Sequence, residues 1–262
     1  MGKTENLILR HSGRGMDVLR PYLPEDFCKQ TAAEILRWPR GTVLMTTGFY
    51  VAGHAETDGP PGTALLAMAL RELGFTPLVL TDACCKGYFE RFRIPVLFIA
   101  NHVSQQELTV LLDERAPVGM ISVERCGENI HGDYANMRGV SIAEHTAPID
   151  RLFELASCPT IGIGDGGNEI GMGNLASIIV EKLSLVPCKV CVNHLVLSTV
   201  SNWGALGLAA ELGWLPDEKT YRSVYELAVE LGYVDGITRR CELGEDGFPL
   251  ETGLQLLRDL RQ

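Results

Sequence analysis

Short apolar runs of strand length alternate with amphipathic stretches of helical period from about residue 40 onward. The runs are rich in Val, Ile and Leu on consecutive positions, which is typical of strands buried on both faces of a parallel sheet. Parallel strands need long crossovers, and the intervening stretches have the length of helices. We therefore predict a three-layer, Rossmann-like α/β fold, an open and mostly parallel sheet with helices on both faces. The predicted strands lie at 41–48, 76–82, 94–100, 118–124, 159–165 and 194–201.

The crossover stretches carry recognisable helix ends. Residues 63–74 finish on Gly74, a residue favoured just beyond a helix C-terminus. Residues 104–116 begin with Ser104 and Glu107, which have the spacing of a capping box. The remaining helices are predicted at 147–157, 174–185 and 202–213.

The two ends of the chain add helical patterns to this alternation. We expect an N-terminal helical extension over about residues 1–40 and a C-terminal helical addition over about residues 214–262. The sequence contains no internal repeat, low-complexity tract or flexible linker, so one α/β domain over residues 1–262 is expected. The terminal helices are predicted at 24–38, 219–234 and 250–261.

The composition disfavours some classes of partner and indicates the cellular compartment. The chain has 262 residues, 46% of them hydrophobic, and its net charge of -10 opposes docking on nucleic acid or an anionic membrane. The strongest apolar stretch, residues 94–100, is too short to span a bilayer, and the N-terminus lacks an apolar signal core. The eight cysteines lie mostly beside apolar runs, as expected in a reducing compartment, so we predict a cytoplasmic protein.

Acidic and amide side chains follow several of the predicted strands. The carboxyl ends of parallel strands meet at one rim of the sheet, where open α/β folds bind ligands. The only cations that the pattern places near this rim are Arg125 and Arg138. The acidic and amide residues after the strands are Glu56, Asp58, Asp82, Glu124, Glu128, Asn129, Asp133, Asp165, Asn168 and Glu169, with Ser201 and Asn202 after the last strand.

Each acid also has a structural explanation, because Asp58 is well placed to cap the helix that starts near Pro60, and Asp82 suits an ordinary turn. Crowded carboxylates nevertheless repel one another and need a compensating charge. That charge can come from a divalent metal with hard oxygen ligands, Mg²⁺, Mn²⁺ or Ca²⁺, or from the ammonium group of a substrate. The predicted metal ligands are Glu56, Asp58, Glu124 and Asp165.

The stretch GIGDGGNEIGMGN at residues 162–174 matches the G-x-G-x-x-G spacing of a dinucleotide site. Asp165 and Glu169, however, occupy the place of a pyrophosphate, and GMGN delays the following helix. We expect the glycines to allow a tight bend and close backbone approach, with Asp165 and Asn168 pointing into the cleft. No dinucleotide is expected.

A set of motifs in the same order along residues 35–215 resembles the D-glutamate cyclase C-terminal-like domain family, long catalogued as a domain of unknown function. The motifs are TTGF, ETDGPPG, VERCGEN, GDYANMRG, GIGDGGNEIGMGN and SNWGALGL. The resemblance, to the stand-alone form of the family, implies a hydro-lyase that converts D-glutamate reversibly into 5-oxo-D-proline and water. It places in the site Glu56, Asp58, Glu124, Asn129, Asp165, Asn168, Glu169, Ser201 and Asn202.

These residues allow roles to be assigned as expectations. Asp165, Glu169 and Glu124 are the predicted catalytic acids, because ring closure needs a base that deprotonates the ammonium group. A metal beside Glu56 and Asp58 would polarise the carboxylate. Predicted substrate-binding residues are Thr46, Thr47, Gly48, Asn129, Arg138, Asn168, Ser201 and Asn202.

Two other functions stay open from the sequence: a divalent-metal-dependent hydrolase, for example on phosphate esters, and a non-catalytic ligand-binding module. In the first case a metal would assist a displacement, and in the second the acids would only cap helices and brace loops. The expected partner is a small amino acid. The oligomeric state is left open, with a homo-oligomer among the alternatives.

Overall fold

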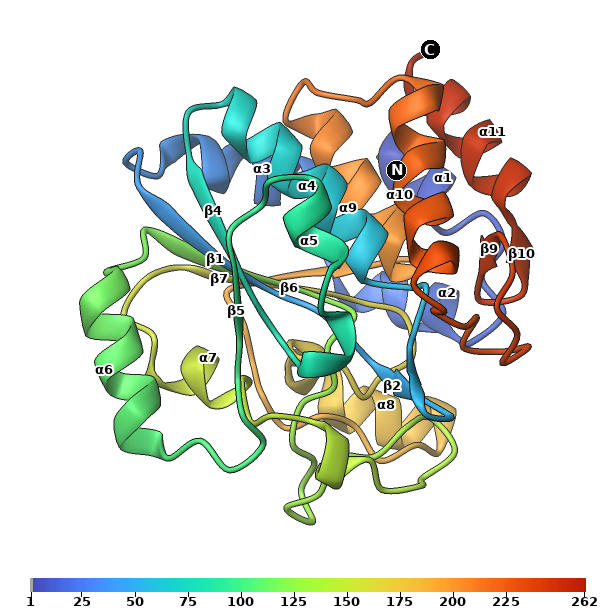
Figure 1. The fold of residues 1–262 in the computed structure, drawn as a ribbon. Helices are drawn as coiled ribbons and strands as arrows, with labels where there is room; N and C mark the ends of the chain where they lie inside the picture. The colour runs from blue at the N-terminus through green and yellow to red at the C-terminus, as the bar shows by residue number, and fades with distance from the viewer. Residues whose placement is uncertain (1) are drawn as a thin grey trace.

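A six-stranded parallel sheet forms the centre of the molecule in the computed structural model, which describes residues 2–262 (Figure 1). Each strand falls inside a predicted range, so the strand predictions are confirmed. All neighbouring strands pair in parallel, in the order β5-β4-β1-β6-β7-β8. The strands are β1 (Thr42–Thr46), β4 (Thr76–Thr81), β5 (Val96–Phe98), β6 (Gly119–Val123), β7 (Thr160–Gly164) and β8 (His194–Leu197).

This strand order is the 3-2-1-4-5-6 order of doubly wound folds. The chain runs outward from β1 to β5 and then returns to the other side of β1 to form β6. The order therefore reverses between β1 and β6, which pair with Thr46 beside Ser122 at their carboxyl ends. Ligands of such sheets bind in the crevice at this reversal point.

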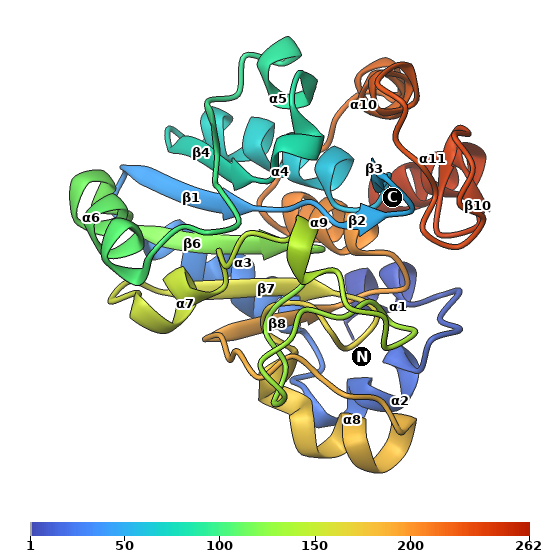
Figure 2. The same ribbon diagram turned by 60° about the horizontal axis from the view of Figure 1, so that its bottom comes forward.

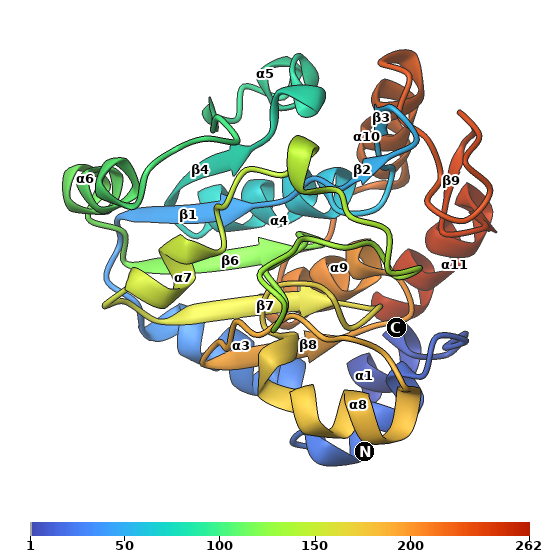
Figure 3. The same ribbon diagram turned by 90° about the horizontal axis from the view of Figure 1, so that it is seen from below.

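Helices cover both faces of the sheet, so the predicted three-layer fold is confirmed. Figure 3 shows one layer, including α7 and α8, in front of the sheet and the other, including α3, α4 and α9, behind it. The capping box of Ser104 and Glu107 is present, and a 3-10 turn, η4 (Met172–Leu175), delays the helix after the glycine-rich loop as predicted. The layers contain α3 (Phe27–Arg37), α4 (Pro60–Glu72), α6 (Gln105–Arg115), α7 (Arg151–Leu155), α8 (Ala176–Leu183) and α9 (Ser201–Glu211).

The N-terminal extension holds more than the single helix predicted for it. Two further helices, α1 (Lys3–Ile8) and α2 (Met16–Leu19), and a 3-10 turn, η1 (Arg20–Tyr22), precede α3. Both extra helices are shorter than two turns, too short to show a helical period in the sequence. The same reason explains why α5 (Tyr88–Arg91) and the 3-10 turns η2 (Ala83–Cys85) and η3 (Ala143–His145) were not predicted.

The C-terminal addition contains the two predicted helices, α10 (Glu218–Glu230) and α11 (Leu250–Leu260), and also a small hairpin. The hairpin joins β9 (Gly244–Glu245) to β10 (Phe248–Pro249) through Asp246 and Gly247, whose φ angles are +50° and +79°. Positive φ at both positions is the geometry of a type I′ turn, for which Asp-Gly is a favoured pair. A second short hairpin, β2 (Tyr50–Val51) with β3 (His54–Ala55), follows β1.

The helices α1 and α2 of the N-terminal extension, together with the C-terminal addition, lie at the edge of the sheet toward which the strands point (Figure 2). Ile8 of α1 and Leu254 and Leu257 of α11 are buried in the same apolar core as the strands. The terminal segments are therefore in position to contribute side chains to the crevice. Within residues 2–262, no helix has the length and apolar character needed to cross a membrane.

Candidate functional site

A cavity of about 460 Å³ lies beyond the carboxyl ends of β1, β6 and β7. Its buried end is lined by acids, each of which is at most 9% exposed. Four of the acids come from predicted strand-end loops, and the fifth comes from the turn of the C-terminal hairpin. The five acids are Glu56, Glu124, Asp165, Glu169 and Asp246.

The glycine-rich loop after β7 folds back on its own strand. A Cβ atom at Gly162 would lie 2.4 Å from the carbonyl oxygen of Ile170, so only glycine fits there. The backbone N–H of Gly167 donates to the Glu169 carboxylate over 2.8 Å. An amide of this loop, which in a dinucleotide fold would face a phosphate, thus binds an acid of the loop itself. Asp165 and Asn168 line the cavity.

Glu124, the first residue after β6, adopts a left-handed backbone conformation with a φ of +45°. A non-glycine residue in this region costs about 1 kcal/mol or more, and such residues concentrate at functional sites. The Ser201 hydroxyl donates to the Glu124 carboxylate over 2.6 Å. The strained backbone and this hydrogen bond hold the Glu124 side chain at the buried end of the cavity.

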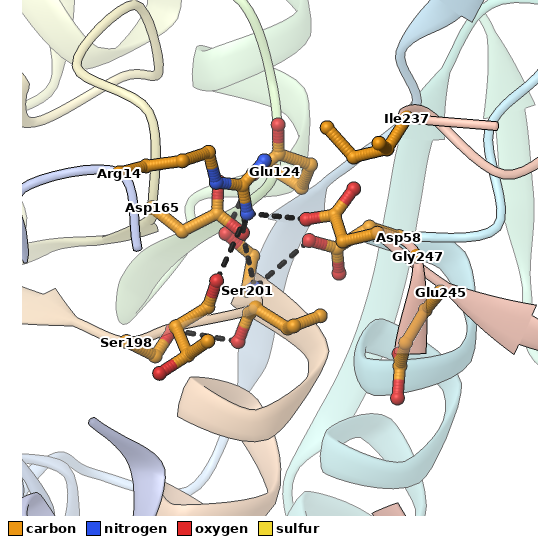
Figure 4. Close-up of polar contacts among 12 residues, drawn as sticks. Arg14, Asp58, Glu124, Asp165, Ser198, Ser201, Ile237, Glu245 and Gly247 are labelled. Carbon is orange, nitrogen blue, oxygen red and sulfur yellow. Dashed lines mark hydrogen bonds and ion pairs between the residues drawn. The ribbon is translucent and has the colours of Figure 1, made fainter. Parts of the chain in front are cut away.

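Arg14, from the segment between α1 and α2, reaches into this acid cluster (Figure 4). Its Nη2 atom lies 2.6 Å from Asp165 Oδ2, forms an ion pair with Asp246, and donates to the carbonyl oxygen of Thr199 over 2.9 Å. The prediction that Arg125 and Arg138 are the only cations near the acids is therefore wrong. A guanidinium group from the N-terminal extension supplies part of the compensating charge.

Arg125 is directed elsewhere, although it follows β6 directly. Its guanidinium is fully buried, forms an ion pair with Asp82 and donates to the carbonyl oxygens of Gly48 and Ala147 over 3.0 and 2.7 Å. None of these residues lines the cavity. Arg125 and Asp82 brace the loops behind the site, whereas Arg138 does line the cavity.

The helices α4 and α9 cap each other across the site. The Asp58 carboxylate accepts hydrogen bonds from the backbone N–H groups of Ser201 and Asn202, over 2.8 and 2.7 Å, at the start of α9. The Asn202 side-chain oxygen in turn accepts from the N–H groups of Gly59 and Gly62, over 2.9 and 2.7 Å, at the start of α4. Asp58 is thus a helix cap, but of the distant helix α9 and not of the helix that follows it.

Replacing Asn202 by Ala is expected to destabilise the protein by about 3 kcal/mol, because four buried groups lose a partner. Besides the two N–H groups, the Asn202 amide donates to the Thr57 carbonyl and to the buried Glu245 carboxylate. Urea denaturation measures the change in the free energy of unfolding. Gln106→Ala, at an exposed position on α6, is the control and should change this free energy by less than about 0.5 kcal/mol. Equal effects of the two substitutions would contradict the mutual capping.

Only some of the predicted substrate-binding residues line the cavity. Arg138 and Asn168 line the cavity. Asn129 accepts hydrogen bonds from the N–H groups of His131 and Asp133 and so braces its own loop. The residues that do not belong to the cavity lining are Thr46, Thr47, Gly48, Asn129, Ser201 and Asn202.

The carboxylates form two groups of three, and within each group one oxygen of every residue lies within 4.8 Å of the others. The first group contains Asp58, Asp165 and Asp246, and the second contains Glu124, Asp165 and Glu169. Of the predicted metal ligands, only Glu56 belongs to neither group among the described residues. Asp165 is common to both, and its Oδ1 is buried without a hydrogen-bond partner in residues 2–262. Arg14 contacts the other oxygen of Asp165, so Oδ1 is the atom left for a metal ion or a substrate ammonium group.

Burial raises the pKa of the acids in and around the cluster. Burial is the largest cause for Glu124 and Asp165, whose pKa values lie well above the usual range, while Arg14 opposes the rise at Asp165. Burial and the charge of Asp246 raise the pKa of Asp58 to about 7. Burial and the charge of Asp58 raise that of Glu245 to about 8. Asp58 and Glu245 therefore titrate near neutral pH, although neither lines the cavity.

These raised pKa values predict that the protein becomes less stable as the pH rises. Asp58 and Glu245 stay protonated in the folded protein up to about pH 7 and 8, but ionise near pH 4 when unfolded. The folded state thus binds more protons in this window, and we expect the free energy of unfolding to fall by at least about 3 kcal/mol between pH 5 and pH 8. Urea denaturation across this range measures the change. Asp58→Asn should flatten the profile, and a stability that rises with pH would contradict the assignment.

The fold and the cavity define an α/β protein with an acidic pocket at the carboxyl edge of a parallel sheet. The sequence matches the family described as D-glutamate cyclase-like, C-terminal, over residues 5–261. The chain therefore belongs to this family. It is also similar to the D-glutamate cyclase, mitochondrial, of Homo sapiens, with 29% identity over 199 residues. The alignment covers 65% of this chain and 32% of the human protein, so the chain spans about a third of the length of that relative.

Three residues of the site were missed by the sequence interpretation: Arg14, Asp246 and Glu245. The last two lie on the C-terminal hairpin, and Glu245 accepts hydrogen bonds from Trp203 and Tyr225 that fasten the hairpin to α9 and α10. The Asp-Gly pair at this turn is a hairpin signal that could have located them. Arg14 has no comparable signal, because it lies in a short connection between two very short helices.

Proposed function

We propose that this protein interconverts D-glutamate with 5-oxo-D-proline and water at the acidic end of the cavity. Membership of the D-glutamate cyclase-like family supports this function. The observation that carries the proposal is the contact of Arg14 with Asp165 and Asp246, because it places cationic N–H groups among buried acids. A substrate ammonium group has the same charge and the same donor chemistry.

Ring closure forms a bond between the α-amino nitrogen and the γ-carboxyl carbon, breaks one carbon–oxygen bond and releases water. The ammonium nitrogen loses two protons in all, and the departing carboxylate oxygen gains two. Asp165 is the proposed base that takes a proton from the ammonium group, since one of its oxygens is unpartnered at the cavity and the ion pair of its other oxygen with Arg14 favours the ionised form. Glu124 is the proposed acid that delivers one of the two protons to the departing oxygen, because burial raises its pKa and so favours its protonated form. Arg14 is suited to bind the reacting γ-carboxylate of the substrate once the substrate ammonium group has replaced Arg14 beside Asp165.

A divalent metal is a further proposal for this site. The donor set is made of carboxylate oxygens, which suits Mg²⁺ or Mn²⁺, and Asp165 and Asp246 each have a buried oxygen without a partner among the described residues. Asp58, Asp165 and Asp246 would hold the ion. When bound, it would polarise a carboxylate and mask its negative charge.

A hydrolase that acts on phosphate esters and a dinucleotide site both have less support. An acidic cavity end repels a phosphate ester, and the starts of α4 and α9 already donate their N–H groups to Asn202 and Asp58. Pro60 and Pro61 in the first turn of α4 have no N–H group to offer a pyrophosphate. We therefore continue to expect a small amino-acid ligand and no dinucleotide. The cytoplasmic location stays a prediction.

The test is incubation of the purified protein with D-glutamate and, separately, with 5-oxo-D-proline, followed by proton NMR. Samples contain EDTA, Mg²⁺ or Mn²⁺, so that a requirement for a metal becomes visible. We expect both reactions to approach the same final ratio of the two compounds. If neither compound is converted under any metal condition, the proposed function is wrong for this chain.

A further inference from the structure

The cavity is divided into two chemically different ends. The acids Glu124, Asp165 and Glu169 are buried at one end, whereas the other end is lined by exposed residues that include Arg138 and Arg239. Its volume of about 460 Å³ is several times that of a five-carbon amino acid and falls in the range of sites for larger ligands. Such sites have volumes of about 300–1,000 Å³. Free glutamate would leave the exposed end empty.

The exposed end carries two arginines from separate segments. Arg138 belongs to the loop after β6 and Arg239 to the segment between α10 and β9. No ion pair or side-chain hydrogen bond is found for either guanidinium within residues 2–262, whereas Arg14 and Arg125 are both paired with acids. In a chain with a net charge of -10, two exposed arginines that line one cavity and have no acidic partner among the described residues favour an anionic group there.

Apolar and aromatic side chains line the same cavity as the arginines and the acids. Tyr50 and His145 stack with their ring centroids 3.8 Å apart, and both line the cavity. Met137, Val140 and Ile237 also line it and are 38%, 59% and 40% exposed. Exposed apolar side chains around a cavity are typical of a binding surface. This part of the cavity therefore suits carbon atoms that precede the anionic group.

Cyclisation leaves only one functional group of the glutamyl unit to which further atoms can be attached. The amine and the γ-carboxyl group of a glutamyl unit become part of the ring, so only its α-carboxyl group is free to carry further atoms. We propose that the substrate is a short peptide with an N-terminal glutamyl residue, whose terminal carboxylate lies against Arg138 and Arg239. The reaction is the one given above, with nitrogen–carbon bond formation and release of one water, and it needs no additional reactant. This inference rests on the proposed function, because that function places the glutamyl unit at the acids.

Isothermal titration calorimetry at low salt tests the inference through binding alone. The ligands are 5-oxoproline, 5-oxoprolyl-alanine and 5-oxoprolyl-alaninamide, each with both enantiomers of the ring. We expect 5-oxoprolyl-alanine to bind about tenfold more tightly than the other two, as one well-placed charged interaction provides. The double variant R138Q/R239Q should lose this tenfold preference. Arg222→Gln, at an exposed position on α10, is the matched control and should keep it.

Equal binding of the three ligands, an unchanged preference in the double variant, or no binding of any ligand would each overturn the inference. The NMR assay separates this failure from that of the proposed function. If free glutamate is converted in the NMR assay but 5-oxoprolyl-alanine is not bound preferentially, the proposed function stands and the inference of a peptide substrate is wrong. An arginine-dependent preference without ring opening of any ligand supports the peptide ligand and contradicts the cyclase reaction.

Discussion

Asp165→Asn is expected to lower kcat for the interconversion of glutamate and 5-oxoproline by about 1,000-fold or more. Loss of a positioned general base costs about 100- to 10,000-fold, and Asp165 also contacts the cation within the cluster. The amide oxygen of Asn can still accept the hydrogen bond from the Ser201 N–H, so the start of α9 keeps a partner. The proton NMR assay measures the rate.

The free energy of unfolding of Asp165→Asn distinguishes loss of catalysis from loss of the folded structure. Since burial disfavours the charged form of Asp165 and Arg14 keeps its ion pair with Asp246, we expect the free energy of unfolding of Asp165→Asn at pH 8 to fall by no more than about 1 kcal/mol, or to rise. Asp113→Asn, at an exposed position on α6, is the matched control and should leave both rate and stability unchanged. If Asp165→Asn had the same kcat as the wild type, Asp165 would not be the catalytic base.

Arg14→Gln is expected to destabilise the protein by about 3 kcal/mol at pH 8, because it leaves Asp165 and Asp246 without their cation. Removing one partner of a buried ion pair costs about 3–5 kcal/mol, and the lower end applies because the Arg14 side chain is 21% exposed. Loss of Arg14 raises the pKa of Asp165 further, so the stability is lost as the pH rises above about 4. The effect should therefore be smaller at pH 5 than at pH 8, which urea denaturation at the two pH values measures.

Arg14→Lys keeps the positive charge and should restore part of the stability lost in Arg14→Gln. Arg37→Gln, at a largely exposed position on α3, removes an arginine far from the acids and should cost less than about 0.5 kcal/mol. An Arg14→Gln variant with the same stability as the wild type at both pH values would show that the acids do not need this cation.

The central sheet could be predicted because its strands carry strong local signals. Runs such as 94–100 are apolar at every position, and a parallel arrangement follows from the helices between the strands. The same reasoning placed Glu124 and Asp165 at one rim, since both directly follow neighbouring strands. The crowding of acids in the cavity was therefore accessible from the order of the strands.

The charge balance of the site could not be predicted, because it depends on contacts between distant parts of the chain. Arg14 and Asp246 meet across 232 positions, and no local pattern indicates their contact. Asn202 and Asp58 were correctly placed near the carboxyl ends of the strands, but their exchange of helix caps depends on how closely α4 and α9 pack. Gly62 makes this close approach possible, since a Cβ atom there would lie 2.7 Å from the Cα atom of Asn202.

The central claim is that the buried acids hold the reacting nitrogen of a glutamyl substrate. A crystal structure with bound 5-oxo-D-proline tests it most directly. We predict that the ring nitrogen lies about 3 Å from a carboxylate oxygen of Asp165 or Glu124, within hydrogen-bond distance, and that the ligand carboxylate points toward the exposed end of the cavity. A ligand bound outside this cavity, or one whose ring nitrogen points away from the acids, would contradict the claim.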